Sequence, residues 1–247
     1  MGTALRISLI NLDRTPERLA EFNRLNEHLG EVSRFRAVDG RTLDVDALTR
    51  IHLLHPSVVS SYTKGALGCA LSHLALWEKA VAKDEVVTIC EDDAIFNRHF
   101  VESAQRLIGT LAADWDIVLW GWNFDSVLSF EMLPAVSPCW VSFDQHDLRE
   151  GIGNFQDQRL SPQLFRLHRA LGLVCYSLSP KGARILRSRC LPLREMGVFF
   201  PGLNRTLYNN GIDIPVNDAY PDINAYVSFP PLVVTKNERE TTTVQRD

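Results

Sequence analysis

The chain has 247 residues, of which 45% are hydrophobic and 23% charged, and its formal net charge is −4. This composition is that of an ordinary globular protein, and it lacks the basic excess of most nucleic-acid-binding proteins. The five cysteines are odd in number and never stand as C-x-x-C, which argues against a disulfide framework and a thiolate zinc site.

The first forty residues predict a β-α-β unit. Residues 5–12, LRISLINL, are short and rich in branched apolar side chains, which is typical of a buried strand. Pro16 then follows residues that can cap a helix, and apolar side chains recur at helical spacing until Gly30. A second strand ends at Asp39-Gly40. This order favours a parallel sheet.

The rest of the chain continues the alternation. Helices are expected over residues 64–84, 99–112 and 180–190, and strands over residues 86–90, 115–122, 169–179 and 230–234. Residues 123–163 lack clear periodicity and are rich in polar residues, Gly and Pro, so we expect loops and short strands there. The last residues, 237–247, have the composition of a frayed tail. The whole pattern indicates one α/β domain.

Three acids follow directly on an apolar strand in VVTICEDDAIF, residues 86–96. Ligands of open α/β sheets bind beyond the carboxyl ends of strands, where Glu91, Asp92 and Asp93 fall. Neighbouring carboxylates repel each other unless a cation neutralises them, and their oxygens suit Mn²⁺ or Mg²⁺. The pattern predicts a metal site for a phosphorylated ligand, with Glu91 and Asp93 on one side of an extended chain and Asp92 opposite. Acids that cap the next segment or face water are the alternative.

Six stretches, in this order, resemble glycosyltransferase family 25, the lipooligosaccharide-type glycosyltransferases. They are ISLINLDRTPERL, FRAVDG, GALGCALSHLALWEKAV, VTICEDDAIF, GLVCYSLSPKGARIL and, more weakly, IPVNDAYPDINAYVSFPPLV. The resemblance implies a GT-A-like, Rossmann-type nucleotide-sugar-binding fold with a mainly parallel central sheet. It also implies an EDD motif in place of the usual DxD, and inverting transfer of galactose or a related hexose. Residues 1–122 would then be the nucleotide-sugar-binding half, 123–235 the acceptor side and 236–247 a tail.

The resemblance implies roles for particular residues. Glu91 and Asp93 are expected to hold Mn²⁺ or Mg²⁺. A UDP-sugar donor is expected to meet a larger set: Asn11, Arg14, Arg18, Asp39, Lys64, His73 and Asp92. Each has a plain alternative, because arginines often line a solvated helix face, Asp-Gly is a common turn pair, and a lone histidine on an apolar helix is usually part of the core.

The general base of the reaction is expected among acids of the acceptor side. Family members tend to show P-V-D in this region, but this chain reads PVND, residues 215–218. The candidates are therefore Asp218, Asp222 and Asp125. Trp120 and Trp122 are expected either to stack on a sugar or to pack in the core. A basic cluster over residues 181–194 is either a solvated helix face or a contact for anionic lipid headgroups.

We therefore predict an enzyme that transfers a hexose, with galactose from UDP-galactose favoured, to a saccharide of lipopolysaccharide, lipooligosaccharide or capsule. No apolar run approaches the roughly 20 residues of a membrane span, and the N-terminus lacks a signal-peptide core, so we expect a cytoplasmic protein, at most peripheral to the inner face of the membrane. Its partners would be the nucleotide-sugar donor and a saccharide acceptor, and one form of this hypothesis has the acceptor linked to a lipid.

Three rival interpretations stay open at the level of sequence. One is a degenerate relative that binds sugar or nucleotide without catalysis. Another is a nucleotidyltransferase, which usually needs a Gly-rich phosphate loop that INLDRTPERL lacks. The third is a receiver-like phosphohydrolase with Asp13 as nucleophile, for which the remaining pattern is missing.

Overall fold

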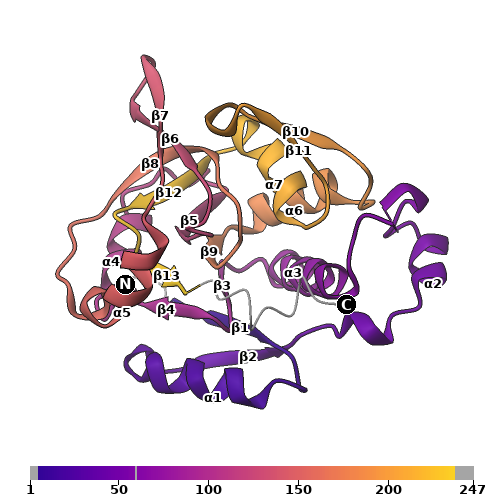
Figure 1. Ribbon diagram of the computed structural model, residues 1–247, viewed down its shortest axis with the longest axis horizontal. Helices are drawn as coiled ribbons and strands as arrows, with labels where there is room; N and C mark the ends of the chain where they lie inside the picture. Colours follow the sequence, from indigo (N-terminus) through magenta and orange to yellow (C-terminus); the bar gives the residue numbers. More distant parts are fainter. Residues whose placement is uncertain (1–4, 59, 237–247) are drawn as a thin grey trace.

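The computed structural model describes residues 5–58 and 60–236. Helices and strands alternate along this part of the chain (Figure 1). The helices are α1 Pro16–Leu25, α2 Val45–Arg50, α3 Lys64–Lys83, α4 Phe100–Ile108, α5 Gln145–Asp157, α6 Pro180–Cys190 and α7 Asp213–Ala219. The strands are β1 Ile7–Asn11, β2 Val32–Arg36, β3 Val87–Glu91, β4 Ala94–Phe96, β5 Ile117–Gly121, β6 Leu128–Leu133, β7 Ser137–Val141, β8 Gln163–Arg169, β9 Cys175–Leu178, β10 Gly197–Phe200, β11 Arg205–Tyr208, β12 Ala225–Phe229 and β13 Val233–Thr235.

Nine of these strands form one mixed sheet in the order β2-β1-β3-β9-β5-β12-β8-β6-β7. β1 pairs in parallel with β2 and β3, as the β-α-β pattern predicts, and β5 pairs in parallel with β12. β9 lies antiparallel between β3 and β5, so the strands on either side of it point the same way. The α/β class with a Rossmann-type sheet is therefore confirmed.

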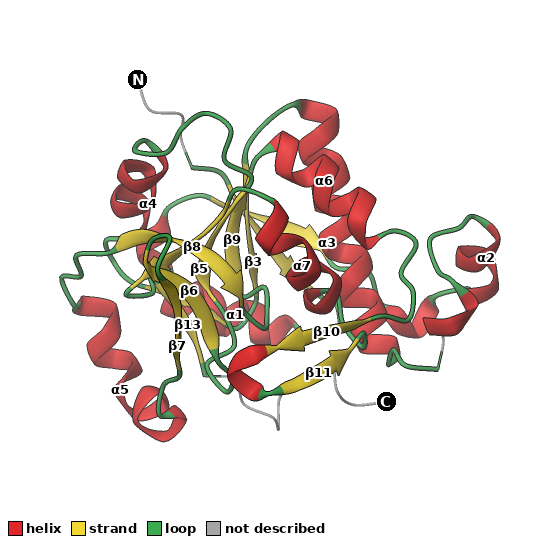
Figure 2. Cartoon of the chain, turned by 90° about the horizontal axis from the view of Figure 1, so that it is seen from above, coloured by secondary structure: helices red, strands yellow, loops and turns green. Residues whose placement is uncertain are grey.

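The sheet is buried on both faces because its central strands alternate apolar side chains between two layers of helices. Ile89 and Leu119 belong to the core on the side of α3, α6 and α7, whereas Cys90 and Trp120 belong to the core on the side of α1 and α4. Figure 2 shows the strands between α4 on one side and α3, α6 and α7 on the other. A strand that is buried on both faces carries apolar side chains at successive positions, which explains the unbroken apolar runs in the sequence.

Helix α3 has the bounds that the sequence predicts. Thr63 caps its start by accepting a hydrogen bond from the backbone N–H of Ala66, and Asp84 ends it in the left-handed conformation. Its first turns pack directly against the loop after β2. A Cβ added to Gly68 would lie only 2.4 Å from the Val38 carbonyl oxygen. A Cβ on Gly40 would come within 1.7 Å of the Lys64 carbonyl oxygen. Gly40 of FRAVDG and Gly68 of GALG therefore allow backbone to touch backbone.

The region expected to hold loops and short strands, residues 123–163, contains more regular structure than predicted. It holds the β6–β7 hairpin and the 13-residue helix α5, which Asp144 caps by accepting from the N–H groups of His146 and Asp147. Two glycines, at 151 and 153, hide the helical spacing of Leu148, Ile152 and Phe155. The sequence also failed to predict α7, β12 and the β10–β11 hairpin.

Three further expectations concern the C-terminal residues, membrane-spanning helices and the cysteines. Residues 237–247, predicted to be a frayed tail, lie outside the described residues. Among those that are described, no helix combines the length and the apolar character needed to cross a bilayer. All five cysteines are free thiols.

Candidate functional site

The acid triplet lies where β3 leaves the sheet. β3 ends at Glu91, Asp92 and Asp93 form a turn, and β4 then pairs with β13 instead of continuing beside β1. The turn overrides the alternation expected of an extended chain. Asp93 lies 3.9 Å from the same Arg18 guanidinium that binds Asp92, whereas Glu91 faces His73 of α3. The expected alternation, with Glu91 and Asp93 on one side of an extended chain and Asp92 opposite, therefore does not hold, although the charge of Glu91 still acts on Asp93.

Asp92 ties the turn to the N-terminal motif. Because β1 and β3 run in parallel register, Asn11 at the end of β1 reaches Asp92 and donates a hydrogen bond to Oδ2 at 2.7 Å. Arg18 of α1 donates to Oδ1 through Nε at 2.7 Å and again through NH2. Burial alone would lower the pKa of Arg18, but the hydrogen bond and charge of Asp92 raise it above its ordinary value. Three residues predicted to bind the donor therefore bind each other and hold the turn.

Asp93 is the least satisfied acid of the triplet. Its Oδ1 makes no hydrogen bond with any described residue. Burial first, and the charge of Glu91 second, raise the pKa of its carboxyl to about 7, although Arg18, Asp92 and Thr235 also act on it. A carboxylate that is costly to ionise and has an unused oxygen fits a nearby divalent cation, which would supply both the charge and the ligand bond.

A fourth acid, Asp213 at the first turn of α7, belongs to the same site although the sequence did not single it out. Its Oδ2 accepts the N–H of Gly172 at 3.1 Å, and burial raises its pKa, with Glu91 adding to the shift. The same carboxylates act together on Cys69 of α3, whose thiol pKa is raised by burial first and then by Glu91, Asp213 and Asp93. Asp213 is therefore linked to the acids of β3 through their charges.

Asn217, the residue that breaks the PVD pattern, has a structural role. Its side-chain oxygen accepts a hydrogen bond from the backbone N–H of Ala170. Its side-chain amide donates to the carbonyl oxygen of Ala170 and, at 2.9 Å, to that of Asp213. It therefore anchors the loop whose Gly172 holds Asp213. The only sequence signal for Asp213 was its place four residues before Asn217. An acid at this place is equally expected in the first turn of an ordinary helix.

The three acids expected to act as base all lie on the surface. Asp218 is exposed on α7, Asp125 is exposed after β5, and Asp222 forms a 3.0 Å ion pair with Arg189.

The remaining donor-binding candidates lie around the ends of β1 and β2. Arg14 donates to Asp39 at 3.0 Å, and Asp39 also accepts from the N–H of Arg41, which together with Arg14 lowers its pKa. Lys64 is exposed at the first residue of α3. His73 is fully buried behind Glu91, so it reaches the site through that carboxylate and not by touching a ligand.

Two groups of side chains outside this site follow the plain alternatives that the sequence left open, core packing and a solvated helix face. Trp120 and Trp122 are buried in the core; Trp120 donates to Ser177 at 2.8 Å and Trp122 stacks on Phe124, so neither offers a face to a sugar. The basic side chains of α6 are mostly neutralised in ion pairs with acids of other elements: Lys181–Asp116, Arg184–Asp84, Arg187–Glu78 and Arg189–Asp222.

A pocket of about 250 Å³ opens beside the turn, between α1 and β4. Its polar wall contains Arg18, Asp92 and Asp93, and its apolar wall contains Phe22 and Ile95. A site for a whole ligand of drug size usually exceeds about 300 Å³, so this pocket suits part of a ligand.

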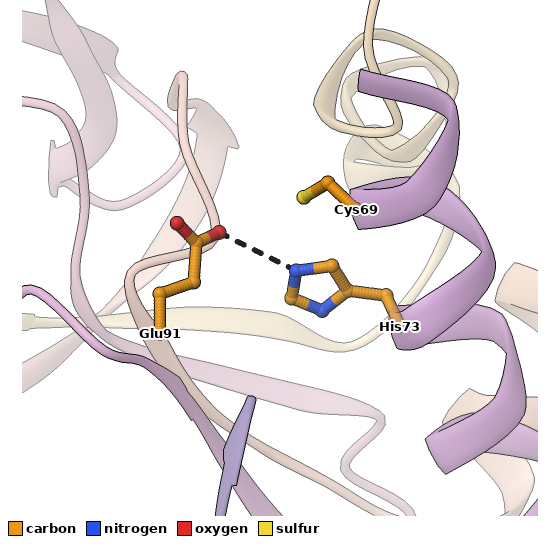
Figure 3. A group of neighbouring side chains, drawn as sticks. All are labelled: Cys69, His73 and Glu91. Atoms are coloured by element: carbon orange, nitrogen blue, oxygen red, sulfur yellow. Dashed lines mark hydrogen bonds and ion pairs between the residues drawn. The ribbon is translucent and has the colours of Figure 1, made fainter. Parts of the chain in front are cut away.

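A second ligand set also meets at Glu91. Cys69 and His73 lie one turn apart on α3 and point at the Glu91 carboxylate, and the three ligand atoms lie within 4.8 Å of one another (Figure 3). Within the described residues, this mixed sulfur, nitrogen and oxygen set is the group of three ligand atoms that meets at metal-binding distance. Glu91 acts on Asp93 and on Asp213 through its charge.

Comparison with known proteins gives one family. The model of glycosyltransferase family 25, described as an LPS biosynthesis protein, matches residues 4–195. A "Glycosyltransferase 25 family member" of Drosophila melanogaster is 36% identical over 126 residues, which cover 47% of this chain and 21% of that protein. A "Probable inactive glycosyltransferase 25 family member 3" of Rattus norvegicus is 35% identical over 151 residues, or 56% of this chain and 26% of the relative.

A third relative is named for an activity. "Procollagen galactosyltransferase 2" of Homo sapiens is 29% identical over 126 residues, which cover 47% of this chain and 20% of that protein. The matched region thus spans about a fifth to a quarter of these three relatives.

Proposed function

The chain belongs to glycosyltransferase family 25, and from this we propose that it is an inverting hexosyltransferase with UDP-galactose as its favoured donor. The acids of β3 and the Asn11–Arg18–Asp92 contacts all lie inside the matched residues 4–195. The name of the procollagen galactosyltransferase relative supports galactose as the sugar. Inversion follows from the family resemblance alone.

The proposed acceptor is a saccharide of lipopolysaccharide, lipooligosaccharide or capsule type, which the description of the family supports. The name of the human relative points to a different acceptor, procollagen. The two acceptor classes are distinguished by offering each with the same labelled donor.

The observation that carries the proposal is the unused Oδ1 of Asp93, on a carboxyl whose pKa is raised to about 7 beside Glu91. Glu91 and Asp93 would hold Mn²⁺ or Mg²⁺, which when bound neutralises charge on the departing nucleotide diphosphate. Arg18 and Asn11 fix the turn through Asp92, so the two ligand carboxylates keep their positions when they ionise. Arg14, Asp39 and Lys64, around the ends of β1 and β2, are proposed to meet the nucleotide.

Asp213 is our choice for the base that accepts the proton of the acceptor hydroxyl. A general base works best when its pKa lies near the working pH, and burial and the charge of Glu91 both raise the pKa of Asp213. The Gly172 N–H donates to Oδ2, and the backbone N–H groups of Asp213 and Ile214 also bind this carboxylate and favour its ionised form. Asp218, Asp222 and Asp125 are the rival bases, each at an exposed position.

The test is a screen of UDP-sugars with Mn²⁺ and Mg²⁺. The correct donor should raise the melting temperature only when the cation is present, since ligands that bind the native state stabilise it by mass action. Asp213→Asn should then lower kcat by about 100-fold, in the range of a lost general base, while Asp218→Asn and Asp222→Asn keep wild-type turnover. Normal turnover by Asp213→Asn would remove it as the base.

A second candidate function is that of a non-catalytic relative that binds sugar or nucleotide. Two observations favour it: relatives from rat and mouse are named inactive, and Asn217 stands where the family pattern has an acid. Cation-dependent donor binding without transfer to any acceptor would support this second function.

A further inference from the structure

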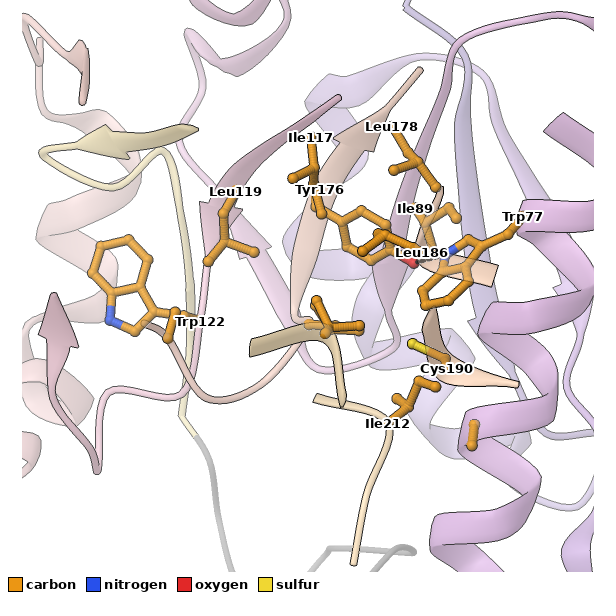
Figure 4. Packing of buried hydrophobic residues seen from close by; sticks show 14 of the residues in the cluster. Trp77, Ile89, Ile117, Leu119, Trp122, Tyr176, Leu178, Leu186, Cys190 and Ile212 are labelled. Carbon is orange, nitrogen blue, oxygen red and sulfur yellow. Dashed lines mark hydrogen bonds between the residues drawn. The ribbon is translucent and has the colours of Figure 1, made fainter. Parts of the chain in front are cut away.

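A chain of buried polar groups runs from the core to Glu91. Trp77 Nε1 lies 2.7 Å from the Tyr176 hydroxyl, which lies 2.8 Å from His73 Nδ1, and His73 Nε2 lies 3.4 Å from Glu91 Oε1. Trp77, Tyr176 and His73 are all completely buried. Figure 4 shows Trp77 and Tyr176 meeting in the core, and Figure 3 shows His73 reaching from α3 to Glu91.

We propose that His73 is a positioning residue, whose Nε2–H orients the Glu91 carboxylate, and that the Trp77–Tyr176 pair fixes the histidine in this tautomer. The role in positioning rests on the proposed function, in which Glu91 is a cation ligand. The tautomer does not, because it follows from hydrogen bonding alone.

The tautomer follows from counting donors and acceptors at the Tyr176 hydroxyl. An indole N–H only donates, so Trp77 fills one lone pair of that oxygen. The hydroxyl then needs an acceptor for its own hydrogen, and within residues 5–58 and 60–236 its other partner is His73 Nδ1. Nδ1 must therefore accept, which places the ring hydrogen on Nε2. In a fully buried site, leaving the hydroxyl hydrogen unbonded would cost about 1–3 kcal/mol.

The hydrogen on Nε2 points at Glu91, which is an acceptor when ionised. At 3.4 Å the contact is longer than the usual 2.9–3.0 Å of an N–H···O bond, so it sets the direction of the carboxylate more than it stabilises the fold. The Glu91 side chain is 28% exposed, so its second oxygen is available to the site. Groups of this kind behind a metal ligand orient it and raise metal affinity.

The same arrangement disfavours the mixed metal set of Cys69, His73 and Glu91. A metal would need the lone pair of His73 Nε2, the atom on which the tautomer places a hydrogen. This requirement disfavours zinc on the mixed set.

The first test reads the tautomer directly in the wild-type chain without added metal. Long-range ¹H–¹⁵N correlation spectra of protein labelled in its histidines distinguish the Nε2–H form, the Nδ1–H form and the doubly protonated ring, and the His73 signal is the one missing from His73→Gln. The Nε2–H pattern, unchanged by Zn²⁺, is expected. An Nδ1–H or doubly protonated pattern, or a zinc-induced change at both ring nitrogens, would overturn the proposal.

The second test separates positioning from packing with two variants of similar size. The amide of His73→Gln reaches the place of Nε2 and can still donate to Glu91, whereas His73→Asn replaces only the Nδ1 end, toward Tyr176. Mn²⁺ binding is measured by electron paramagnetic resonance. His73→Asn should bind Mn²⁺ about 10-fold more weakly, the lower end of what the loss of such a supporting group costs, and His73→Gln should stay within about threefold of wild type.

The outcomes separate this inference from the proposed function. Equal loss in both folded variants would contradict positioning by Nε2–H, while a wild-type chain that binds no Mn²⁺ would contradict both the cation role of Glu91 and the positioning role. Cys69→Ser should leave the Mn²⁺ affinity unchanged, and a large loss there would instead support the mixed metal set.

Discussion

Helices α3 and α5 each carry two glycines, but Gly68 of α3 and the two glycines of α5 have opposite surroundings. The second glycine of α3, Gly68, touches the backbone of the loop after β2, where a Cβ would lie 2.4 Å from the Val38 oxygen. The glycines of α5, at 151 and 153, have no atom within 4 Å of an added Cβ. α3 is buried along most of its length, whereas α5 buries only Ile152 among its residues.

The difference shows what a glycine in a helix means. In α3 the missing side chain lets two backbones meet and so fixes the wall from which Cys69 and His73 face Glu91. In α5 it only adds flexibility, because nothing approaches it. The same residue type is therefore required by contact in one helix and is merely a weak helix former in the other.

The largest effect is expected from filling the contact in α3. Gly68→Ala places a methyl group against backbone atoms that cannot rotate away, so we expect a loss of about 3 kcal/mol of unfolding free energy, the upper end for overpacking. Urea unfolding followed by circular dichroism measures this loss. A Gly68→Ala chain as stable as wild type would contradict the claim that backbone contact requires glycine at this position.

A similar free energy is expected from the acid turn after β3, whose Glu91 faces α3. Asp93→Ala removes the carboxylate with the unused oxygen, so turnover of the UDP-sugar with Mn²⁺ should fall about 100-fold, which corresponds to about 2.7 kcal/mol. Initial rates with saturating donor and acceptor measure the change.

The matched control lies on α5. Glu150→Gln removes an exposed acid that faces His146 at 3.5 Å, and its turnover should equal that of wild type. Parallel losses in both variants would show that net charge, and not the site on β3, controls the rate.

The pH dependence of stability should come from Asp93, in the turn after β3. Burial and Glu91 raise the pKa of Asp93 from 3.8 to about 7, so the native state holds a proton that the unfolded chain releases. The cation-free protein should therefore lose stability as the pH rises from about 4 to about 7. Melting temperatures across this range should fall less steeply in Asp93→Asn than in wild type, and equal slopes would contradict the raised pKa.

The smallest effect should come from α5 and carry the opposite sign. Gly153→Ala fills open space in a helix interior, so the chain should gain about 0.5–1 kcal/mol of stability. The same urea titration measures it. A destabilised Gly153→Ala chain would mean that α5 packs against something that this chain alone does not contain.

Local pattern was enough to predict much of the fold. The apolar run before Glu91, the helix after Pro16 and the capped helix that begins at Lys64 are read within ten to twenty residues, and all three formed. The first of these helices ends at Leu25, before the predicted Gly30, and a 3-10 turn follows it. By contrast, the glycines of α5 hid a helix whose Leu148 and Phe155 pack on the core, and α7 is too short to show periodicity.

The sequence by itself determined the layered α/β fold, the family, and the place of three acids at the end of a buried strand, because strand ends and motif order are local properties of the chain. Only the tertiary structure decided which way those acids face. The turn at Asp92 gives that residue to Arg18 and Asn11, and the packing of α3 places His73 behind Glu91. The fold also brings Asp213 from more than a hundred residues away into the same field of charge, a neighbour that no spacing along the chain could show.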